Sequence, residues 1–396
     1  MKTSERINRL AESETIRMSR LSRELAAQGH DIINLSLGEP DFDTPEHIRL
    51  AAKKAIDDGF SHYSPISGFQ DLRVAISKKF SRENELEFTP EQIVVSTGAK
   101  QSIANVVLSI VNPGDEVILA MPYWVSYLEI IKLAEGVPVF IHTTIDSDFK
   151  ATPEQISQAI TPRTKLFIYS SPCNPTGSVY GHDELKAMAD VFEKHPHVFV
   201  LSDEIYEHIN FIGKHESIAQ FESIKDRVIV INGVSKGYAM TGWRIGYMGA
   251  PKWIAQACDK MQGQITSGAC SIAQKASIAA LQPDITPTLE MQKAFLRRRN
   301  LVLSMLREID GLKINEPEGA FYVFPDVSAF FGKKDEENII GNAPDLCMYL
   351  LHKAFVSLVP GDAFGAPSCI RISYAASDEK LMEAVKRMKT ALEKLK

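Results

Sequence analysis

Short apolar runs alternate with amphipathic helical stretches from about residue 93 onward, and this alternation constrains the fold more than any other feature of the chain. Apolar strands that alternate with helices form a mostly parallel sheet with helices on both faces. We therefore predict an α/β fold. The predicted strands are 93–97, 116–120, 165–170, 198–203, 228–234 and 245–250, and the predicted helices include 100–111, 127–134 and 183–194.

The pattern changes after Gln282-Pro283, where a long helix is predicted over 288–309. Mixed short strands and helices follow it, which is typical of a second, α+β domain. The expected parts are an N-terminal arm over 1–44 that packs with the smaller domain, a large domain over 45–287 and a smaller C-terminal domain over 288–396.

Two local predictions concern helices. Thr44 is the expected N-cap of a helix over 45–58, which Pro45 would open. The three successive arginines Arg297, Arg298 and Arg299 lie on the predicted long helix. Successive helical residues point in different directions, so we expect a solvated face with one packed arginine rather than an anion-binding patch.

Composition excludes several classes of protein. The 396 residues carry 44 Lys and Arg against 50 Asp and Glu, a net charge of −6, which argues against a generally basic nucleic-acid binder. No apolar run approaches the length of a membrane span, and the first ten residues lack a secretion signal. The five cysteines form no C-x-x-C pair and the histidines show no metal-ligand spacing. We expect a cytoplasmic protein without a metal site, a disulfide framework, or a nucleic-acid or membrane partner.

The common nucleotide-binding motifs are absent. The chain has neither G-x-G-x-x-G nor a P-loop, which argues against dinucleotide and ATP binding. Residues 233–237 match G-x-S-x-G by letter, but His352 is the one histidine that follows them. A serine hydrolase with that motif needs a later histidine and an oxyanion loop, so this alternative is weak.

Polar residues lie at the ends of four of the predicted strands, in chain order. They are Asn174, the pair Asp203 and Tyr206, Lys236, and Arg244 just before the last strand. Ligands of such sheets bind at the carboxyl ends of the strands, so these side chains are expected to meet. Each residue taken alone has an ordinary structural explanation, such as a turn, an N-cap or a solvated lysine. Together they fit a pyridine ring that bears a phenolic oxygen, an aldehyde and a phosphate.

These residues give the chain a resemblance to the fold-type I pyridoxal phosphate (PLP) enzymes, the class I and II aminotransferases. The resemblance covers residues 37–374 and implies a seven-stranded sheet. It is closest to the bacterial branch of the aspartate aminotransferases. The motifs that carry it are Asn174-Pro175-Thr176-Gly177, Asp203-Glu204-Ile205-Tyr206, Ser235-Lys236, Gly242-Trp243-Arg244-Ile245-Gly246, Gly98-Ala99-Lys100-Gln101 and Pro122-Tyr123-Trp124-Val125-Ser126-Tyr127.

The resemblance implies roles toward the cofactor. The catalytic residues would be Lys236, which joins the aldehyde of PLP and moves a proton at the substrate Cα, Asp203, which pairs with the ring nitrogen, and Tyr206. Tyr206 and Asn174 would bond the phenolic oxygen, and Trp124 would stack on the ring. The phosphate would be held by Gly98, Ala99, Lys100, Ser235, Arg244 and, from the neighbouring subunit of a homodimer, Tyr63.

The resemblance also implies the substrate contacts. Arg371 would bind the α-carboxylate with help from Gly38 and Asn174, because its planar fork matches a carboxylate. Some aspartate aminotransferases bind the distal carboxylate with an arginine of the partner subunit, but the stretch 261–274 contains no arginine. The resemblance to the bacterial branch implies that Lys100 binds this carboxylate instead, and that Trp124 also contacts the substrate.

The expected reaction is ping-pong transfer of the amino group of L-aspartate to 2-oxoglutarate. Aromatic amino acids, alanine or prephenate are alternative substrates. A non-catalytic cofactor-binding regulator and a lyase or synthase on the same scaffold are alternative classes.

Overall fold

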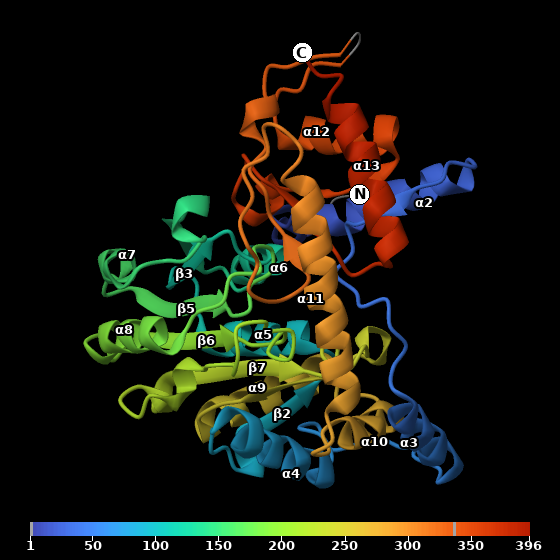
Figure 1. Cartoon of the computed structure of the whole chain (residues 1–396). Helices are drawn as coiled ribbons and strands as arrows, with labels where there is room; N and C mark the ends of the chain where they lie inside the picture. The colour runs from blue at the N-terminus through green and yellow to red at the C-terminus, as the bar shows by residue number, and fades with distance from the viewer. Residues whose placement is uncertain (1–2, 336–337) are drawn as a thin grey trace.

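A seven-stranded sheet forms the centre of the protein, for which the computed structural model describes residues 3–335 and 338–396 (Figure 1). Its strand order is β2-β8-β7-β6-β5-β3-β4. Of these described strands, β8 runs in the direction opposite to the other six. The predicted α/β class with a mostly parallel sheet is therefore confirmed. The strands are β2 Ile93–Ser96, β3 Glu116–Met121, β4 Val137–His142, β5 Thr164–Ser170, β6 Phe199–Asp203, β7 Val228–Gly233 and β8 Gly246–Gly249.

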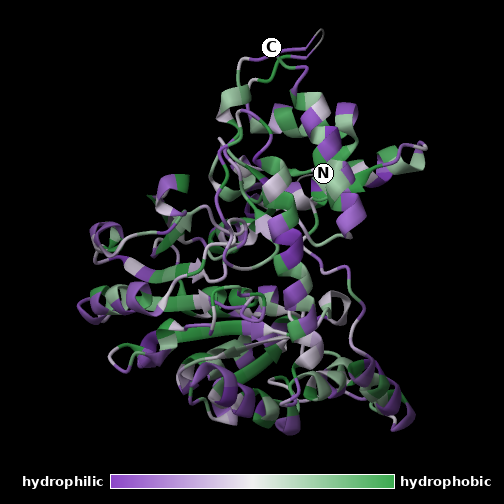
Figure 2. Cartoon of the chain, in the orientation of Figure 1, coloured by the Kyte–Doolittle hydropathy of each residue, from purple (hydrophilic) through white to green (hydrophobic). Residues whose placement is uncertain are grey.

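Both faces of this sheet are buried, which explains why its strands read as continuous apolar runs. On β5, Leu166 and Ile168 enter one core while Phe167 and Tyr169 enter the other. Figure 2 shows the central strands coloured as hydrophobic. The first core includes residues of α5 Ala99–Ile110, α6 Val125–Leu133 and α9 Lys252–Ile265. The second includes residues of α3 Glu46–Asp57, α4 Gln70–Lys79, α7 Pro153–Ala159, α8 His182–Glu193 and α10 Ser271–Ala280.

The strand β4 was not among the runs predicted from the apolar pattern. It lies at the edge of the sheet. Of its six residues only Ile141 is fully buried, and the other five are exposed or partly buried. Pro138 within it is compatible with an edge strand because proline cannot donate to a second neighbour. An edge strand carries a weaker apolar pattern than a central one.

The C-terminal part has its own small sheet and core. A three-stranded antiparallel sheet has the order β11-β12-β9, and the long helix α11 runs beside it (Figure 1). The elements are α11 Thr286–Leu306, β9 Tyr322–Val323, α12 Ala343–Tyr349, β10 Val356–Ser357, β11 Val359–Pro360, β12 Ile370–Ser373 and α13 Asp378–Leu392.

The N-terminal segment contributes to the hydrophobic core of the C-terminal part. It contains α1 Glu5–Asn8, α2 Glu14–Ala27 and β1 Ile33–Asn34, and β1 pairs in parallel with β10. Met18 and Leu35 share a hydrophobic cluster with Phe295 of α11. The exact division of the chain into arm, large domain and small domain stays a prediction.

The predicted cap of α3 is wrong. The helix starts at Glu46 after Pro45, and no side chain caps it. Thr44 is buried instead, and its hydroxyl donates to the carbonyl oxygen of Ala239 (2.7 Å) and accepts from the indole of Trp243 (3.0 Å). The hydroxyl is used to fix the start of the large domain to the loop that follows β7.

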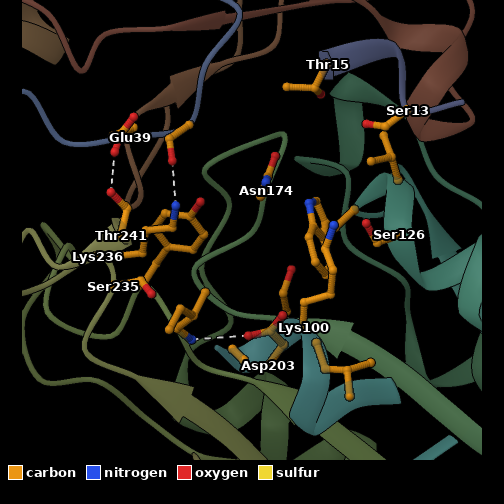
Figure 3. Close-up of a pocket in the computed structure, with 18 of the residues that line it drawn as sticks. Ser13, Thr15, Glu39, Lys100, Ser126, Asn174, Asp203, Ser235, Lys236 and Thr241 are labelled. Carbon is orange, nitrogen blue, oxygen red and sulfur yellow. Dashed lines mark hydrogen bonds between the residues drawn. The ribbon is translucent and has the colours of Figure 1, made fainter. Parts of the chain in front are cut away.

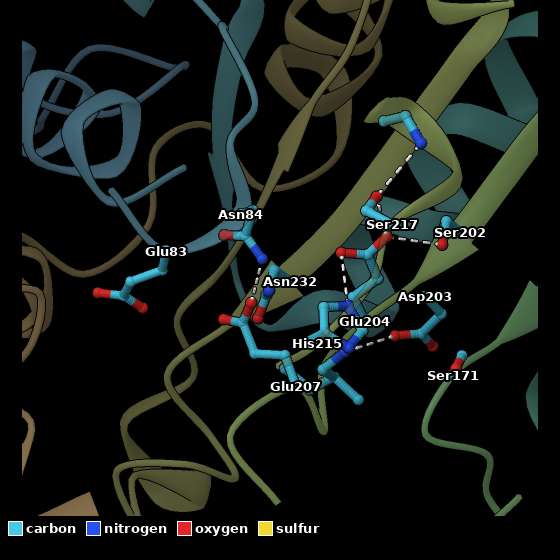
Figure 4. Close-up of polar contacts among 12 residues, drawn as sticks. Glu83, Asn84, Ser171, Ser202, Asp203, Glu204, Glu207, His215, Ser217 and Asn232 are labelled. Carbon is cyan, nitrogen blue, oxygen red and sulfur yellow. Dashed lines mark hydrogen bonds and ion pairs between the residues drawn. The ribbon is translucent and has the colours of Figure 1, made fainter. Parts of the chain in front are cut away.

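A buried ion pair joins Lys79 to Glu207, a residue that follows β6. Figure 4 shows the carboxylate of Glu207 and the hydrogen bond that it accepts from Asn84. The ammonium of Lys79, at the end of α4, donates to Glu207 and to Asn84 (2.8 Å), and Asn84 donates to the other oxygen of Glu207 (2.7 Å). Burial raises the pKa of Glu207, but the charge of Lys79, with smaller contributions from His208, His215 and Asn84, outweighs burial and holds that pKa well below its usual range. Glu83, Glu207 and His208 lie close enough together to bind one metal ion. The ammonium of Lys79 already pairs with both carboxylates, so their negative charge is compensated without a metal.

Within the two described ranges, no helix combines the length and apolar character that a bilayer crossing requires.

Replacing Lys79 with Met is expected to lower the free energy of unfolding by about 3–5 kcal/mol, because Glu207 is left buried without its partner. The double variant Lys79→Met with Glu207→Leu should recover most of that loss. Denaturant unfolding measures both. The control Lys54→Met breaks an exposed pair with Asp58 and should cost about 0.5 kcal/mol or less. Equal losses in the two single variants would contradict the expectation.

Candidate active site

A pocket of about 350 Å³ opens at the carboxyl ends of the central strands (Figure 3). It is bounded by the loops after β5, β6 and β7, the starts of α5 and α6, segment 36–42, α2, β9 and β12. Most of the site residues predicted from sequence line it together: Gly38, Ala99, Lys100, Trp124, Asn174, Asp203, Tyr206, Ser235, Lys236, Arg244 and Arg371.

Lys236 lies three residues after β7 and is partly buried in the pocket. Its ammonium donates to the carbonyl oxygen of Gly38 (2.5 Å). The pKa of Lys236 is lowered to about 8, chiefly by burial. The charges of Arg371 and Arg244 contribute to the lowering, while those of Glu39 and Asp203 oppose it. A substantial fraction of this amine is therefore neutral near physiological pH, as a nucleophile requires.

Asp203 is the last residue of β6 and is 5 % exposed. One carboxylate oxygen accepts from the hydroxyl of Tyr127 (2.6 Å) and the other from the backbone N–H of Ile205 (3.3 Å). Burial raises its pKa to about 6, although both hydrogen bonds oppose the rise. A buried carboxylate of this kind is stabilised by a cationic group of a ligand.

Arg371 is 2 % exposed on β12. Its guanidinium donates to the side-chain oxygen of Asn174 (2.9 Å) and to the carbonyl oxygen of Ser36 (2.6 Å), and it lies 4.5 Å from the ring centre of Tyr322. Its Nε is buried without a hydrogen-bond partner. The guanidinium faces neutral oxygens, so its positive charge is available to an anionic ligand.

A second cationic corner lies at the start of α5. Gly98 has a φ of +86°, and a Cβ added there would stand 2.3 Å from Nη2 of Arg244. Arg244 donates to the carbonyl oxygen of Thr241 (2.8 Å), and Ser235 is buried nearby in the same pocket. Helix N-termini carry free N–H groups and attract anions, so Ala99 and Arg244 together suit a phosphate.

Lys100 stands at the pocket mouth, with its ammonium 5.1 Å from the ring centre of Trp124. Partial burial lowers its pKa, and the charge of Arg244 contributes. Trp124 is the N-cap residue of α6 and packs edge-on against Tyr127.

Two residues expected to bond the phenolic oxygen of PLP have protein partners here. The hydroxyl of Tyr206 is bonded to the hydroxyl of Tyr322 (2.8 Å), and the side-chain oxygen of Asn174 accepts from Arg371. Their contacts with PLP stay predictions. Gly98 is buried and is not among the residues that line the pocket, and its predicted phosphate contact stays a prediction. Tyr63 is 98 % exposed and does not reach the pocket of its own chain.

Sequence reasoning gave no role to three residues that the structure places in the site. Tyr127 bonds Asp203, Tyr322 bonds Tyr206, and Glu39 accepts from Thr241. Tyr127 follows the predicted strand 116–120, whose carboxyl end meets the same sheet edge. Tyr322 comes from the small sheet, and no local pattern indicates its contact with Tyr206.

The hydrolase alternative has no geometric support. Ser235 of the G-x-S-x-G match lies in the pocket, but His352 is exposed in the helical turn after α12 and is not among the lining residues.

Comparisons with known proteins show what the whole chain is similar to. The family model described as aminotransferase class I and II matches residues 30–388. The chain is 46% identical to the aspartate/prephenate aminotransferase of Nitrosomonas europaea, over 99% of this chain and 100% of that protein. It is 47% identical to a Petunia hybrida bifunctional aspartate aminotransferase and glutamate/aspartate-prephenate aminotransferase, over 99% of this chain and 83% of that protein. The crystal structure of an aspartate aminotransferase from Rhizobium meliloti superposes with a TM-score of 0.96 at 42% identity and full coverage of both chains.

The substitution Glu39→Gln should lower the pKa of Lys236 below about 8, because it removes a negative charge that raises this pKa. Only the neutral amine reacts with acylating reagents, so the pH profile of Lys236 acetylation, read by mass spectrometry, should move to lower pH. The control Glu24→Gln changes an exposed residue of α2 and should leave the profile in place. A profile that stays put or moves upward in Glu39→Gln would refute the assignment.

Proposed function

This chain belongs to the class I and II aminotransferases, and from that premise we propose that it is a PLP-dependent transaminase that moves the amino group of L-aspartate to 2-oxoglutarate. The observation that carries the proposal is the shared pocket of Lys236, Asp203 and Arg371. These three side chains supply a reactive amine, a buried carboxylate and a buried guanidinium. An amino acid and an electron-withdrawing pyridine ring require this set.

The described residues fit PLP. The buried carboxylate of Asp203 is suited to a protonated ring nitrogen, since a cation there offsets the cost of burial. The N-terminus of α5 at Ala99, with Ser235 and Arg244, suits the phosphate. Lys236 suits the aldehyde because its lowered pKa leaves part of the amine neutral. Trp124 lies beside Tyr127 and offers an aromatic face to the ring.

When bound, PLP supplies an aldehyde for the amino group and a ring that withdraws electrons from the substrate Cα. Lys236 is proposed as the general base that moves the proton at Cα, a contribution of about 10²–10⁴-fold in such reactions. Asp203 keeps the proton on the ring nitrogen, and the hydroxyl of Tyr127 holds Asp203 in place. Tyr206, bonded to Tyr322, is proposed to face the phenolic oxygen.

Arg371 is proposed to bind the substrate α-carboxylate. Its unpartnered Nε and its two other bonds to Asn174 and Ser36 leave a fixed guanidinium plane in the pocket. A fixed plane suits bidentate recognition of a carboxylate.

Lys100 is proposed to bind the distal carboxylate of a dicarboxylic substrate. It remains available at the pocket mouth after Arg371, Arg244 and Lys236 are assigned to other groups. The relatives named above include aspartate/prephenate aminotransferases, so prephenate as a further amino acceptor is the second candidate activity.

We further propose a cytoplasmic homodimer. Tyr63 is 98% exposed, so its side chain is free to reach the phosphate site of a second copy. This assignment would make each pocket incomplete in a single chain.

The variant Lys236→Ala should lose the visible absorbance of PLP joined to the protein and at least about 10²-fold in kcat. Absorbance spectra of purified protein after incubation with PLP measure the first effect. The exposed Lys260→Ala serves as the control and should keep both colour and rate. A coloured Lys236→Ala protein would place the attachment on another lysine.

A panel of amino donors with 2-oxoglutarate should give L-aspartate the highest kcat/KM, and glutamate formation separates a transaminase from a lyase. In Lys100→Ala, kcat/KM should fall about tenfold or more for aspartate and little for alanine, because alanine has no distal carboxylate. Prephenate with glutamate as donor tests the second activity. Equal losses for aspartate and alanine would remove Lys100 from its proposed role.

A further inference from the structure

Segment 36–42, called the strap here, crosses the pocket between the two parts of the molecule. Leu35, just before it, donates its backbone N–H to the carbonyl oxygen of Ser357 on β10 (2.9 Å) and accepts from the backbone N–H of Ser373 on β12 (3.0 Å). Thr44, just after it, is bonded to the loop that follows β7. The strap is therefore tied to different elements at its two ends, and what holds its middle decides where its backbone lies.

The strap contributes backbone carbonyl groups to two proposed site residues. The carbonyl oxygen of Ser36 accepts from Arg371 (2.6 Å), and that of Gly38 accepts from Lys236 (2.5 Å). Gly38 also lies so close to Tyr322 that an added Cβ would stand 2.0 Å from its hydroxyl oxygen. A small displacement of the strap would therefore move the acceptors of both cations.

Arg298 of α11 holds the far end of the strap. Its guanidinium forms two parallel hydrogen bonds with the carboxylate of Asp41 (2.6 and 2.9 Å) and lies 4.9 Å from the ring centre of Phe42. Phe42 packs edge-on against Phe295, one turn earlier on α11. The Arg298 side chain is 8% exposed and that of Asp41 is 31% exposed, so the pair is partly screened by solvent. The two parallel hydrogen bonds fix its geometry.

The same guanidinium reaches a third segment. Its Nε lies 3.4 Å from Asp378, the first residue of α13, while the neighbouring Arg297 pairs with that aspartate from a 62% exposed position. The sequence predicted one packed arginine among the three, and the structure shows that it is Arg298. It joins the strap, α11 and α13 at one point.

We propose that the Arg298–Asp41 pair is a clamp whose role is to position the strap, and through it the acceptors of Arg371 and Lys236. The proposal rests on the proposed function for its kinetic consequences, and on the structure alone for the placement of the strap. Arg298 and Asp41 are positioning residues, because neither lines the pocket. Their effect acts on the α-carboxylate site, which every amino-acid substrate shares.

The test compares Arg298→Gln and Asp41→Asn with the matched control Arg297→Gln. Both clamp variants should lower kcat/KM about ten- to hundredfold, mainly through KM, and by the same factor for aspartate and alanine. The dissociation constant for maleate, a dicarboxylate that cannot be transaminated, should rise in parallel. Arg298→Lys keeps the charge without the planar fork and should be intermediate, while Arg297→Gln should stay within about twofold of the wild type.

Amide hydrogen exchange of the protein without added PLP measures the local stability of the strap directly. Amides of 36–42 should exchange faster in Arg298→Gln than in Arg297→Gln. Equal exchange in those two variants, or unchanged maleate binding by a folded clamp variant, would overturn the clamp. A wild type that binds neither PLP nor maleate would overturn the proposed function instead, and the exchange comparison would still decide on the clamp. Asp41 is partly exposed, so Asp41→Asn keeps the test valid if Arg298→Gln does not fold.

Discussion

Burial of both faces of the central sheet is the constraint on which the rest of the structure depends. Its strands have apolar side chains on each side, so polar groups are confined to the strand ends. Parallel strands bring those ends to one edge, where Asp203, Ser235 and Lys236 emerge from neighbouring loops. The pocket is therefore a consequence of how the sheet is covered.

The electrostatics of the pocket follow from its depth. Asp203 and Arg371 are almost fully buried, and each is stabilised mainly by neutral hydrogen-bond partners. Burial raises the pKa of the Asp203 carboxyl to about 6 and lowers that of the Lys236 amine to about 8, so both pKa values lie near pH 7. Such unbalanced charges are costly in a folded protein. They are suited to a ligand that brings a cationic ring nitrogen and a carboxylate of its own.

Much of this site was predictable from sequence because its residues follow successive strands. Asn174, Asp203 and Lys236 each come within six residues of a strand end, and the chain order of a parallel sheet then brings them together. Tyr322 was not predictable in this way, because its contact with Tyr206 depends on how the small sheet meets the large one. The proposed role of Tyr63 depends on a second copy of the chain, which no spacing within one chain encodes. Thr44 was mistaken for a cap because its local pattern fits one, while its hydroxyl is used in a long-range contact.

The sequence by itself determined the α/β class, the order of the central elements and the set of polar residues at one sheet edge, since these follow from local periodicity and chain order. Only the tertiary structure decided that Arg371 and segment 36–42 reach the same pocket, and that Arg298 rather than its neighbours bonds Asp41. The physical reason is that desolvation and charge–charge distance depend on packing between segments hundreds of residues apart. Those two quantities set the pKa of Lys236, and hence the reactivity of the amine.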